Sequence, residues 1–306
     1  MTKSDISMTF RPPKRNKIWE MVTIERRVHR LFRYRKFWFP SRAQATEISQ
    51  SLRPNDVVRF FAASTNLGKL PHLVEHYKMQ TAWLDLSAGP DALLSAMKRK
   101  SCRYELHRAE KMLHRVAIEI GSERANRDFL AVYNDFTLAK GLPGLAARWI
   151  QQNSAHCETL VLYLDGSPLC SHLLLRDPET RIVRLLYSGS RRLESPEDAA
   201  ACGALNRYLH WRELQRYYAR GFLTFDFGGL GRPESIARFK LSFGGTIRTD
   251  HYYLLSGQQW VARLGKLVYE RILRRRTFKP ETDIPDQDAA TDAASMGQPG
   301  AAPFAV

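Results

Sequence analysis

The sequence is poor in cysteine and contains no long apolar run. Its four cysteines, Cys102, Cys157, Cys170 and Cys202, are scattered and form no CxxC pair, which argues against a disulfide framework and against a cysteine-based zinc site. No run approaches the roughly 20 apolar residues of a transmembrane helix. Residues 1–10 are polar and no apolar core follows them, so no secretory signal is expected. We therefore expect a cytoplasmic protein with reduced thiols.

Several catalytic motifs are missing as well. The chain has no Walker loop, no GxSxG, no HExxH and no zinc-type cysteine spacing, so none of the functions that these motifs indicate is suggested. We expect no metal cofactor. The 306 residues, 44% of them hydrophobic, are ample for one large or two small domains with a buried core.

Acidic residues are outnumbered, since 47 Lys and Arg face 31 Asp and Glu, for a net charge of +16. The excess gathers in residues 11–42, 98–115 and 263–279. Such patches predict a polyanionic partner, which could be nucleic acid, an anionic membrane surface or a phosphorylated small molecule. The alternative is that these side chains only cover solvated faces.

In the first third of the chain, apolar residues between 18 and 32 recur at helical spacing among arginines. A basic amphipathic helix of this kind can lie on anionic lipid, and the aromatic group of Tyr34, Phe37, Trp38 and Phe39 follows it. Packing against the protein's own domain is the alternative. Strands are then predicted at 57–63 and 81–86, with a short helix at 70–77 between them and a basic helix over 91–113.

From residue 116 onward, the alternation of predicted strands and helices is clearer. A strand is predicted at 116–120, and helices at 123–140 and 145–152. Three strands follow at 158–164, 168–176 and 181–188, with the turn Asp165-Gly166 between the first two, so they form an antiparallel meander. A long helix over 198–220, a strand at 222–227, a helix at 233–243, a strand at 246–255 and a helix at 260–276 complete the order.

The most informative stretch is residues 222–254. Asp226 lies in an aromatic-rich strand, where a carboxylate needs a partner, and Lys240 lies on the helix that follows. Asp226 could merely cap its turn or pair with Arg232 or Arg238.

Asp226-Phe-Gly-Gly followed by Phe239-Lys240-x-x-Phe243-Gly244-Gly245 resembles the closing signature of the FemAB-like acyltransferases, a branch of the GNAT superfamily that includes BioF2-like members. A second match is Trp83-Leu-Asp-Leu-Ser87 with Lys98-Arg-Lys-Ser-Cys-Arg103 and Arg108-Ala-Glu-Lys111. The resemblance spans residues 81–255. It implies an α/β fold of GNAT type, a mixed and largely antiparallel sheet flanked by helices and splayed between its fourth and fifth strands for the acyl donor.

The resemblance also implies a domain plan. Residues 17–87 would be a truncated GNAT-like N-terminal part and residues 88–276 the GNAT acyltransferase domain. Residues 1–16 and the acidic tail 277–306 are predicted to be disordered.

Acyl transfer requires a base, stabilisation of the carbonyl oxygen and alignment of the reactants. The candidate bases are Asp226, His172 and Tyr187, although a lone strand histidine is more often a structural residue. Lys240 would supply positive charge. The backbone at Tyr187, Ser188 and Gly189, which ends the fourth GNAT strand, would bind the donor carbonyl. The candidate basic residues for donor or substrate binding are Arg103, Arg108 and Arg238.

The expected function is acyl transfer from acyl-CoA, as co-substrate, to an amine or hydroxyl of a cell-envelope polysaccharide or glycan precursor. Residues 189–203 lack the glycine-spaced phosphate cradle of ordinary GNAT enzymes, so aminoacyl-tRNA remains the alternative donor. A non-enzymatic basic adaptor for membrane or nucleic acid on a GNAT scaffold is the other alternative. Peripheral contact with the inner face of the membrane is a further expectation.

Overall fold

Two long strands, β4 (Leu73–Asp85) and β10 (Thr246–Ser256), run side by side through the middle of the sheet. The structure is a computed structural model that describes residues 22–28, 32–194, 196–231, 234–258 and 260. In this part of the chain ten strands form one sheet in the order β1-β2-β3-β10-β4-β9-β8-β7-β6-β5. The other strands are β1 (Thr23–Val28), β2 (Phe32–Trp38), β3 (Asp56–Ala63), β5 (Val116–Ile120), β6 (Cys157–Leu164), β7 (Ser167–Asp177), β8 (Ile182–Ser190) and β9 (Thr224–Gly229).

Neighbouring strands are antiparallel except for the β2–β3 and β8–β9 pairs, which are parallel. This mixed and largely antiparallel sheet confirms the expected fold class. The described helices are α1 (Arg42–Gln50), α2 (Gly89–Ala96), α3 (Tyr104–Glu110), α4 (Glu123–Ala139), α5 (Ala147–Asn153), α6 (Pro196–Ala219) and α7 (Glu234–Leu241), with short η1 (Arg99–Arg103) and η2 (Leu113–Arg115) turns.

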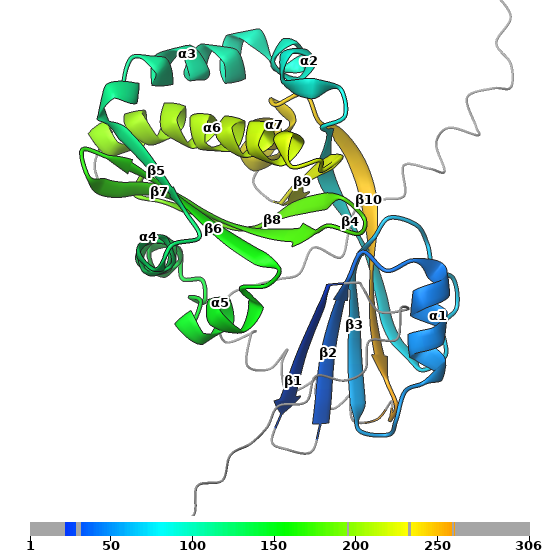
Figure 1. The fold of residues 1–306 in the computed structure, drawn as a ribbon. Helices are drawn as coiled ribbons and strands as arrows, with labels where there is room; N and C mark the ends of the chain where they lie inside the picture. Colours follow the sequence, from blue (N-terminus) through cyan, green and yellow to red (C-terminus); the bar gives the residue numbers. More distant parts are fainter. Residues whose placement is uncertain (1–21, 29–31, 195, 232–233, 259, 261–306) are drawn as a thin grey trace, which may run out of the picture. The chain divides into compact units, whose positions relative to one another are not determined.

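The helices cover both faces of the sheet. Figure 1 shows α2, α3, α6 and α7 on one side of the strands from β9 to β5, and α4 with α5 on the other. One hydrophobic core lies under α2, α3 and α6, and a second lies under α4 and α5 and includes Trp38 and Trp83. A third packs α1 against β3 and β10. None of the described helices combines the length and the apolar character that crossing a membrane requires.

The N-terminal segment differs from the prediction. Strands β1 and β2 replace the basic amphipathic helix expected over 18–32, of which residues 18–21 and 29–31 lie outside the described part. The backbone hydrogen bonds of the sheet outweigh the helical spacing of the apolar residues. Phe37, Trp38 and Phe39 are buried, so the aromatic group packs inside the protein rather than forming a membrane-facing surface.

Two other helix predictions are corrected. The helix expected at 70–77 is instead the first part of β4, which pairs with β10 from Leu73 onward. The helix expected over 91–113 is interrupted at Met97 and Lys98, whose backbones are extended. Lys98 donates its N–H to the carbonyl oxygen of Ser242 at 2.9 Å, so contact with the end of α7 breaks this helix.

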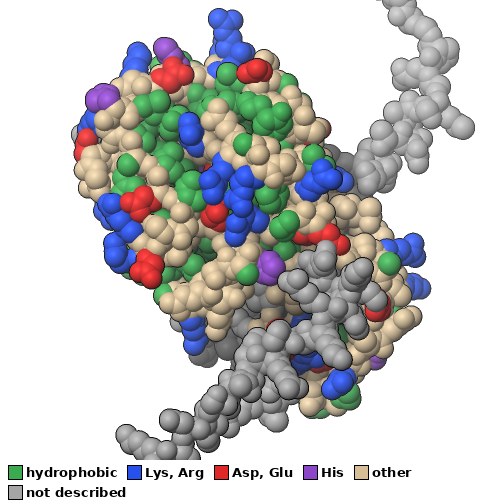
Figure 2. All heavy atoms as spheres, in the orientation of Figure 1, with side chains coloured by type: hydrophobic (Ala, Val, Ile, Leu, Met, Phe, Trp, Pro, Cys, Tyr) green, Lys and Arg blue, Asp and Glu red, His purple; other side chains and the backbone are tan. Residues whose placement is uncertain are grey.

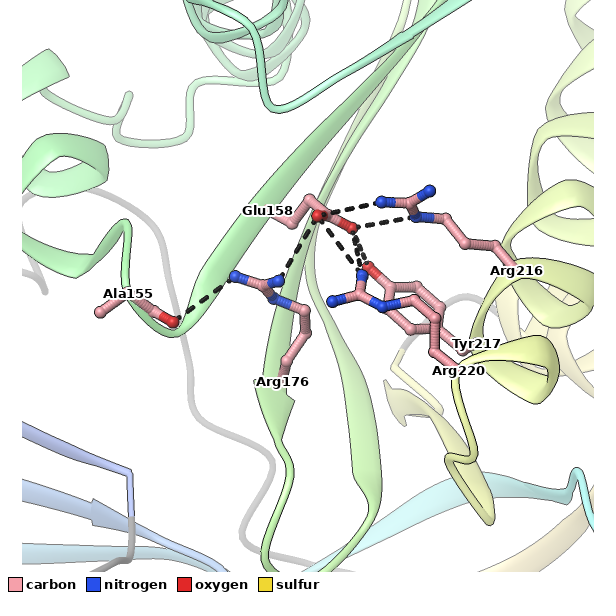
Figure 3. A network of polar contacts seen from close by, with 6 residues as sticks. All are labelled: Ala155, Glu158, Arg176, Arg216, Tyr217 and Arg220. Atoms are coloured by element: carbon pink, nitrogen blue, oxygen red, sulfur yellow. Dashed lines mark hydrogen bonds and ion pairs between the residues drawn. The ribbon is translucent and has the colours of Figure 1, made fainter.

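The strands and helices predicted between residues 116 and 255 are confirmed, with shifts of at most two residues at their ends. The end of α6 is fixed to the sheet by one carboxylate on β6 (Figure 3). Glu158 accepts hydrogen bonds from Arg176 of β7, from Arg216 and Tyr217 of α6, and from Arg220.

The predicted boundary at residues 87 and 88 stays a prediction. Strand β10 inserts between β3 and β4, so the sheet around the N-terminal strands is completed by a strand from the far end of the chain. The disordered ends predicted for 1–16 and 277–306 and the helix predicted for 260–276 lie outside the described residues, apart from Trp260.

Candidate active site

Strands β8 and β9 separate after only three residue pairs. Ile182, Val183 and Arg184 face Thr224, Phe225 and Asp226 in register. Strand β8 continues to Ser190 paired with β7, and none of the described residues of β9 pairs with it beyond Arg184. The backbone edge of β8 beyond Arg184 is therefore not paired with β9. This is the splay between the fourth and fifth strands that the GNAT resemblance implies.

Glycines shape the end of β9. Gly228 has a φ of +71°, and its N–H donates to Asp226 Oδ1 at 2.7 Å. A Cβ on Gly228 would lie 3.1 Å from the carbonyl oxygen of Leu185, and one on Gly229 would lie 2.8 Å from Met79 Sδ. The Asp-Phe-Gly-Gly sequence thus folds a tight turn that occupies one oxygen of its own aspartate.

The partner of Asp226 is Arg184. Arg184 Nη1 donates to Asp226 Oδ2 and, at 2.9 Å, to Asp250 Oδ2, while Nη2 donates to the hydroxyl of Tyr252 at 2.7 Å. All four side chains are buried. Arg238, one of the expected partners, is exposed and lies 3.9 Å from Glu234; the other, Arg232, lies outside the described residues.

Burial sets the protonation behaviour of this cluster. It raises the pKa of Asp226, against the opposing charge of Arg184, and it raises the pKa of Asp250 to about 6. Burial alone would lower the pKa of Arg184, but the charges of Asp226 and its neighbours outweigh it and raise that pKa. The guanidinium therefore stays charged between two carboxylates.

Lys240 reaches the end of β9 from α7. Its Nζ donates to the carbonyl oxygen of Gly229. Burial lowers the pKa of Lys240 to about 8, against the opposing effect of Asp226. The structure therefore brings two sequence-predicted residues, Asp226 and Lys240, to the same end of one strand, at the point where β8 and β9 diverge.

His172 lies apart from them. It belongs to the face of the sheet that packs under α6, where Glu213 Oε1 lies 2.6 Å from its Nδ1 and Asn206 Oδ1 lies 2.9 Å from its Nε2. His210 stacks on it with 4.1 Å between ring centroids, and its Nδ1 lies 2.8 Å from Glu213 Oε2. Arg184 and Asp226 face the other side, in the core that contains Trp83, so the structure does not bring His172 to Asp226.

His172, His210 and Glu213 are also the described residues whose geometry could suit a metal ion. Their candidate ligand atoms lie within 4.8 Å of one another, and all three side chains are buried. Hydrogen bonds already join these atoms, so the arrangement also stands as a self-contained polar network.

The predicted donor-binding backbone lies beyond the splay. Tyr187 packs against Tyr133 of α4 and Trp149 of α5, with 5.1 Å and 5.9 Å between ring centroids. A Cβ on Gly189 would lie 2.8 Å from the Cα of Tyr133, so α4 presses directly on β8 there. Ser188, between them, is half-buried.

The three predicted arginines are not part of the Arg184 cluster. Arg108 bonds to Glu105 at 3.0 Å within α3, and Arg103 is half-buried just before that helix with an unpaired Nε. Helix α3 packs on α6 (Figure 1), on the His172 side of the sheet. A cavity of about 500 Å³ is lined by Arg115, by Arg191 and, from α6, by Ala201, among other residues.

Sequence reasoning missed Arg184, Asp250, Tyr252, His210 and Glu213. Some of these residues are charged and lie in otherwise apolar stretches, as Asp226 does, and this pattern indicates a buried charge that needs a partner. The pairings join positions 42 and 66 residues apart, which a single sequence does not reveal.

Comparisons with known proteins agree with this geometry. The family model described as "Acetyltransferase (GNAT) domain" matches residues 96–241. The solved structure of FemX superposes with a TM-score of 0.57 at 11% identity, covering 79% of this chain and 85% of that one. A conserved protein of unknown function from Bacteroides thetaiotaomicron superposes with a TM-score of 0.50 at 11% identity, covering 72% and 79%. None of the curated proteins compared with the sequence matches it. Residues 96–241 thus match the GNAT acetyltransferase domain, and the chain has a fold like that of FemX, in agreement with the expected resemblance to the FemAB-like branch of the GNAT superfamily.

Proposed function

We propose that the protein transfers an acyl group from acyl-CoA to an amine or hydroxyl of a cell-envelope polysaccharide or glycan precursor. The observation that carries the proposal is the divergence of β8 and β9 immediately beyond Arg184 and Asp226, with Lys240 at the end of β9. A strand that diverges from its neighbour can present backbone N–H groups to an extended ligand, as in β-strand addition.

Each part of the reaction has a candidate group in this proposal. The backbone of Tyr187, Ser188 and Gly189 binds the donor along the part of β8 that has diverged from β9. The ammonium group of Lys240 stabilises the negative charge that develops on the acyl carbonyl oxygen. Arg184 and Asp226 hold the end of β9 in place, because both oxygens of Asp226 are engaged in the turn and the ion pair.

The envelope acceptor rests on the FemAB-like resemblance, with the FemX-like fold as support. In this proposal the enzyme works in the cytoplasm on precursors at the inner face of the membrane. The aromatic residues expected to touch the membrane do not serve there, because Phe37, Trp38 and Phe39 are buried.

Thermal stabilisation by acetyl-CoA, longer acyl-CoAs and free coenzyme A tests the donor. A donor at about 100 times its Kd adds about 2.7 kcal/mol to the free energy of unfolding, a shift of several degrees. The variant Lys240→Ala should reduce turnover more than stabilisation, because Lys240 is assigned to the reacting carbonyl. Lys69→Ala, at an exposed lysine in another part of the chain, is the control. Absence of any shift with every thioester would refute an acyl-CoA donor.

Aminoacyl-tRNA is the second candidate donor. Lys98, Arg99 and Lys100 are exposed on one short segment, and residues 189–203 lack the phosphate cradle of ordinary GNAT enzymes. Figure 2 shows the basic side chains of the presented face among acidic and hydrophobic ones rather than as one continuous field. If tRNA is the donor, its affinity should fall steeply with salt, and less so in a Lys98→Ala/Lys100→Ala variant.

A further inference from the structure

Asp250 has an oxygen that no group in the described part of the protein uses. Its Oδ2 accepts from Arg184, whereas its Oδ1 is buried without a hydrogen-bond partner. Asp226 differs, because Arg184 and the Gly228 N–H occupy its two oxygens. Of the two carboxylates that Arg184 holds, Asp250 is therefore the one with an oxygen available for a proton.

Three more unpaired polar atoms belong to the same face of the sheet. They are Thr81 Oγ1, Trp83 Nε1 and Trp38 Nε1, all in side chains at least nine-tenths buried. Residues opposite one another in register share a face, as do residues two apart on a strand. Buried polar atoms normally have partners, so four unpaired ones on one face indicate the place of a polar ligand.

Strand register places these groups around Arg184. Trp83 faces Asp226 across the β4–β9 pair, and Asp226 faces Arg184 across the β8–β9 pair. Thr81 faces Arg248 across the β4–β10 pair, two residues from Asp250. The ring of Trp38 lies 5.6 Å from the guanidinium carbon of Arg184.

We propose that Asp250 Oδ1 is the catalytic base of the acyl transfer, and that Thr81, Trp83 and Trp38 bind oxygen atoms of a hydroxylated amine or alcohol acceptor. The proposal rests on the proposed function, which supplies the acyl donor. It assigns to Asp226 a positioning role, because that carboxylate holds Arg184 and the glycine turn.

The proton and the bonds balance in this scheme. The acceptor nitrogen or oxygen forms a bond to the acyl carbonyl carbon, and its proton moves to Asp250 Oδ1. The carbon–sulfur bond of the thioester breaks, and the coenzyme A thiolate leaves and takes up that proton. Asp250 returns to its starting state.

The charged groups around Asp250 suit a base that works near neutral pH. The pKa of Asp250 is raised to about 6, mainly by burial and also by the charge of Asp226, while Arg184 and Arg248 act to lower it. Tyr252 shares Arg184 on the same side and is itself uncharged at neutral pH, since burial raises its pKa. The carboxylate is thus ionised at neutral pH and can still release its proton afterwards.

The test compares Asp250→Asn with Asp177→Asn. Asp177 is a matched control because it is also buried, has an unpaired Oδ2 and has a pKa that burial raises. It lies elsewhere in the sheet, at the end of β7, where it pairs with Ile182 at the start of β8. Coenzyme A release from acetyl-CoA is followed with glucosamine, ethanolamine or water as acceptor. Asp250→Asn should lower kcat by about 100-fold or more, abolish the acidic limb of the pH profile near pH 6 and leave stabilisation by acetyl-CoA unchanged.

Trp83→Phe tests the acceptor site. It should raise the KM for glucosamine about three- to tenfold, as loss of one hydrogen bond implies, without raising the KM for acetyl-CoA. Trp211→Phe on α6 is its control.

Three results would overturn the proposal, and they are distinguishable. Stabilisation by acetyl-CoA with full activity and an unchanged pH profile in Asp250→Asn refutes Asp250 as the base and leaves the proposed function standing. If acetyl-CoA stabilises the wild-type protein but no acceptor causes coenzyme A release, the acyl transfer does not occur and Asp250 cannot be its base. Neither stabilisation nor release refutes the acyl-CoA function, and this proposal falls with it.

Discussion

Arg184 holds two buried carboxylates, Asp226 and Asp250, through the same nitrogen atom, Nη1. One carboxylate belongs to β9 and the other to β10, and these strands are separated in the sheet by β4. The guanidinium thus spans three neighbouring ladders at the point where β8 leaves β9. The charged cluster of Arg184, Asp226 and Asp250 therefore lies at the point where β8 and β9 splay apart.

Replacing Arg184 should therefore be costly to stability. In Arg184→Met both carboxylates remain buried without a counter-charge, so the free energy of unfolding should fall by about 3–5 kcal/mol. Adding Asp226→Asn and Asp250→Asn to Arg184→Met removes the two unpaired charges and should restore part of the lost free energy of unfolding. Urea unfolding measures these differences. Arg33→Met, which breaks an exposed pair with Glu25, should cost less than about 1 kcal/mol; equal losses in the two variants would contradict the argument.

Gly244 of the Phe-Gly-Gly sequence should tolerate no side chain. It has a φ of +88°, and a Cβ there would lie 2.9 Å from both the Cβ and the carbonyl oxygen of Ala96. Gly166 has a φ of +79° with open space around it, so Gly166→Ala isolates the backbone strain, about 1 kcal/mol. Gly244→Ala should cost at least about 1–3 kcal/mol more, since the clash is with backbone. Similar melting temperatures for the two variants would show that α2 moves away freely.

The buried histidine network predicts a loss of stability in acid. Burial lowers the pKa of His210 to about 4. Between pH 4 and 6.5 the unfolded chain therefore binds a proton at this residue that the folded protein excludes, and stability falls as the pH drops. Burial would raise the pKa of Glu213, but His172 and His210 outweigh it and lower that pKa to about 2. The stabilisation that ionised Glu213 provides is therefore lost as the pH falls below about 4.5, so this group also makes the protein less stable in acid.

His210→Asn isolates the histidine contribution. The variant retains an N–H donor toward Glu213 but does not titrate, so the slope of unfolding free energy against pH between 4 and 6.5 should fall by up to about 1.4 kcal/mol per unit. Chemical denaturation at several pH values measures it. His107→Asn, which replaces an exposed histidine of α3, is the control. A slope that is the same in His210→Asn and the wild type would mean that His210 is protonated in the folded protein.

The order of strands and helices in the second half of the chain could be predicted from the sequence because short local patterns, such as turn residues, specify it. The Asp165-Gly166 turn specifies the hairpin between β6 and β7, since both residues adopt the positive φ that such turns use. Strand β9 and helix α7 end within two residues of the positions that the glycines after Asp226 and Phe243 predicted. These features depend on a few adjacent residues, and no distant partner is needed to predict them.

Predictions failed where long-range pairing decides. Residues 70–77 become strand only because β10 pairs with them, and β10 begins more than 160 residues later in the chain. The apolar residues of 18–32 fit a helical spacing, but pairing of β2 with β3 buries Phe37 and Trp38. In the same way, the apolar surroundings of Asp226 showed that it needs a partner but not that Arg184, on another strand, provides it.

Glu158 should matter for stability because three arginines converge on it. Burial would raise its pKa, but hydrogen bonds from Arg216 and Tyr217 and the charge of Arg176 outweigh burial and lower it. In Glu158→Ala the three guanidinium groups repel one another, so we expect a loss of about 2–3 kcal/mol at pH 7. The lowered pKa means that this stabilisation is present above about pH 4.5 and is lost as the pH falls, so wild type and variant should converge in acid.

Salt separates this mechanism from a simple loss of packing. Repulsion among partly exposed arginines is screened as ionic strength rises, so 1 M salt should recover part of the loss in Glu158→Ala at pH 7. Glu119→Ala, which removes a partner of Arg124 near the surface, should cost less than about 1 kcal/mol. A loss in Glu158→Ala that is the same at low and high salt would show that the carboxylate acts through its hydrogen bond to Tyr217 rather than by neutralising the arginines at the end of α6.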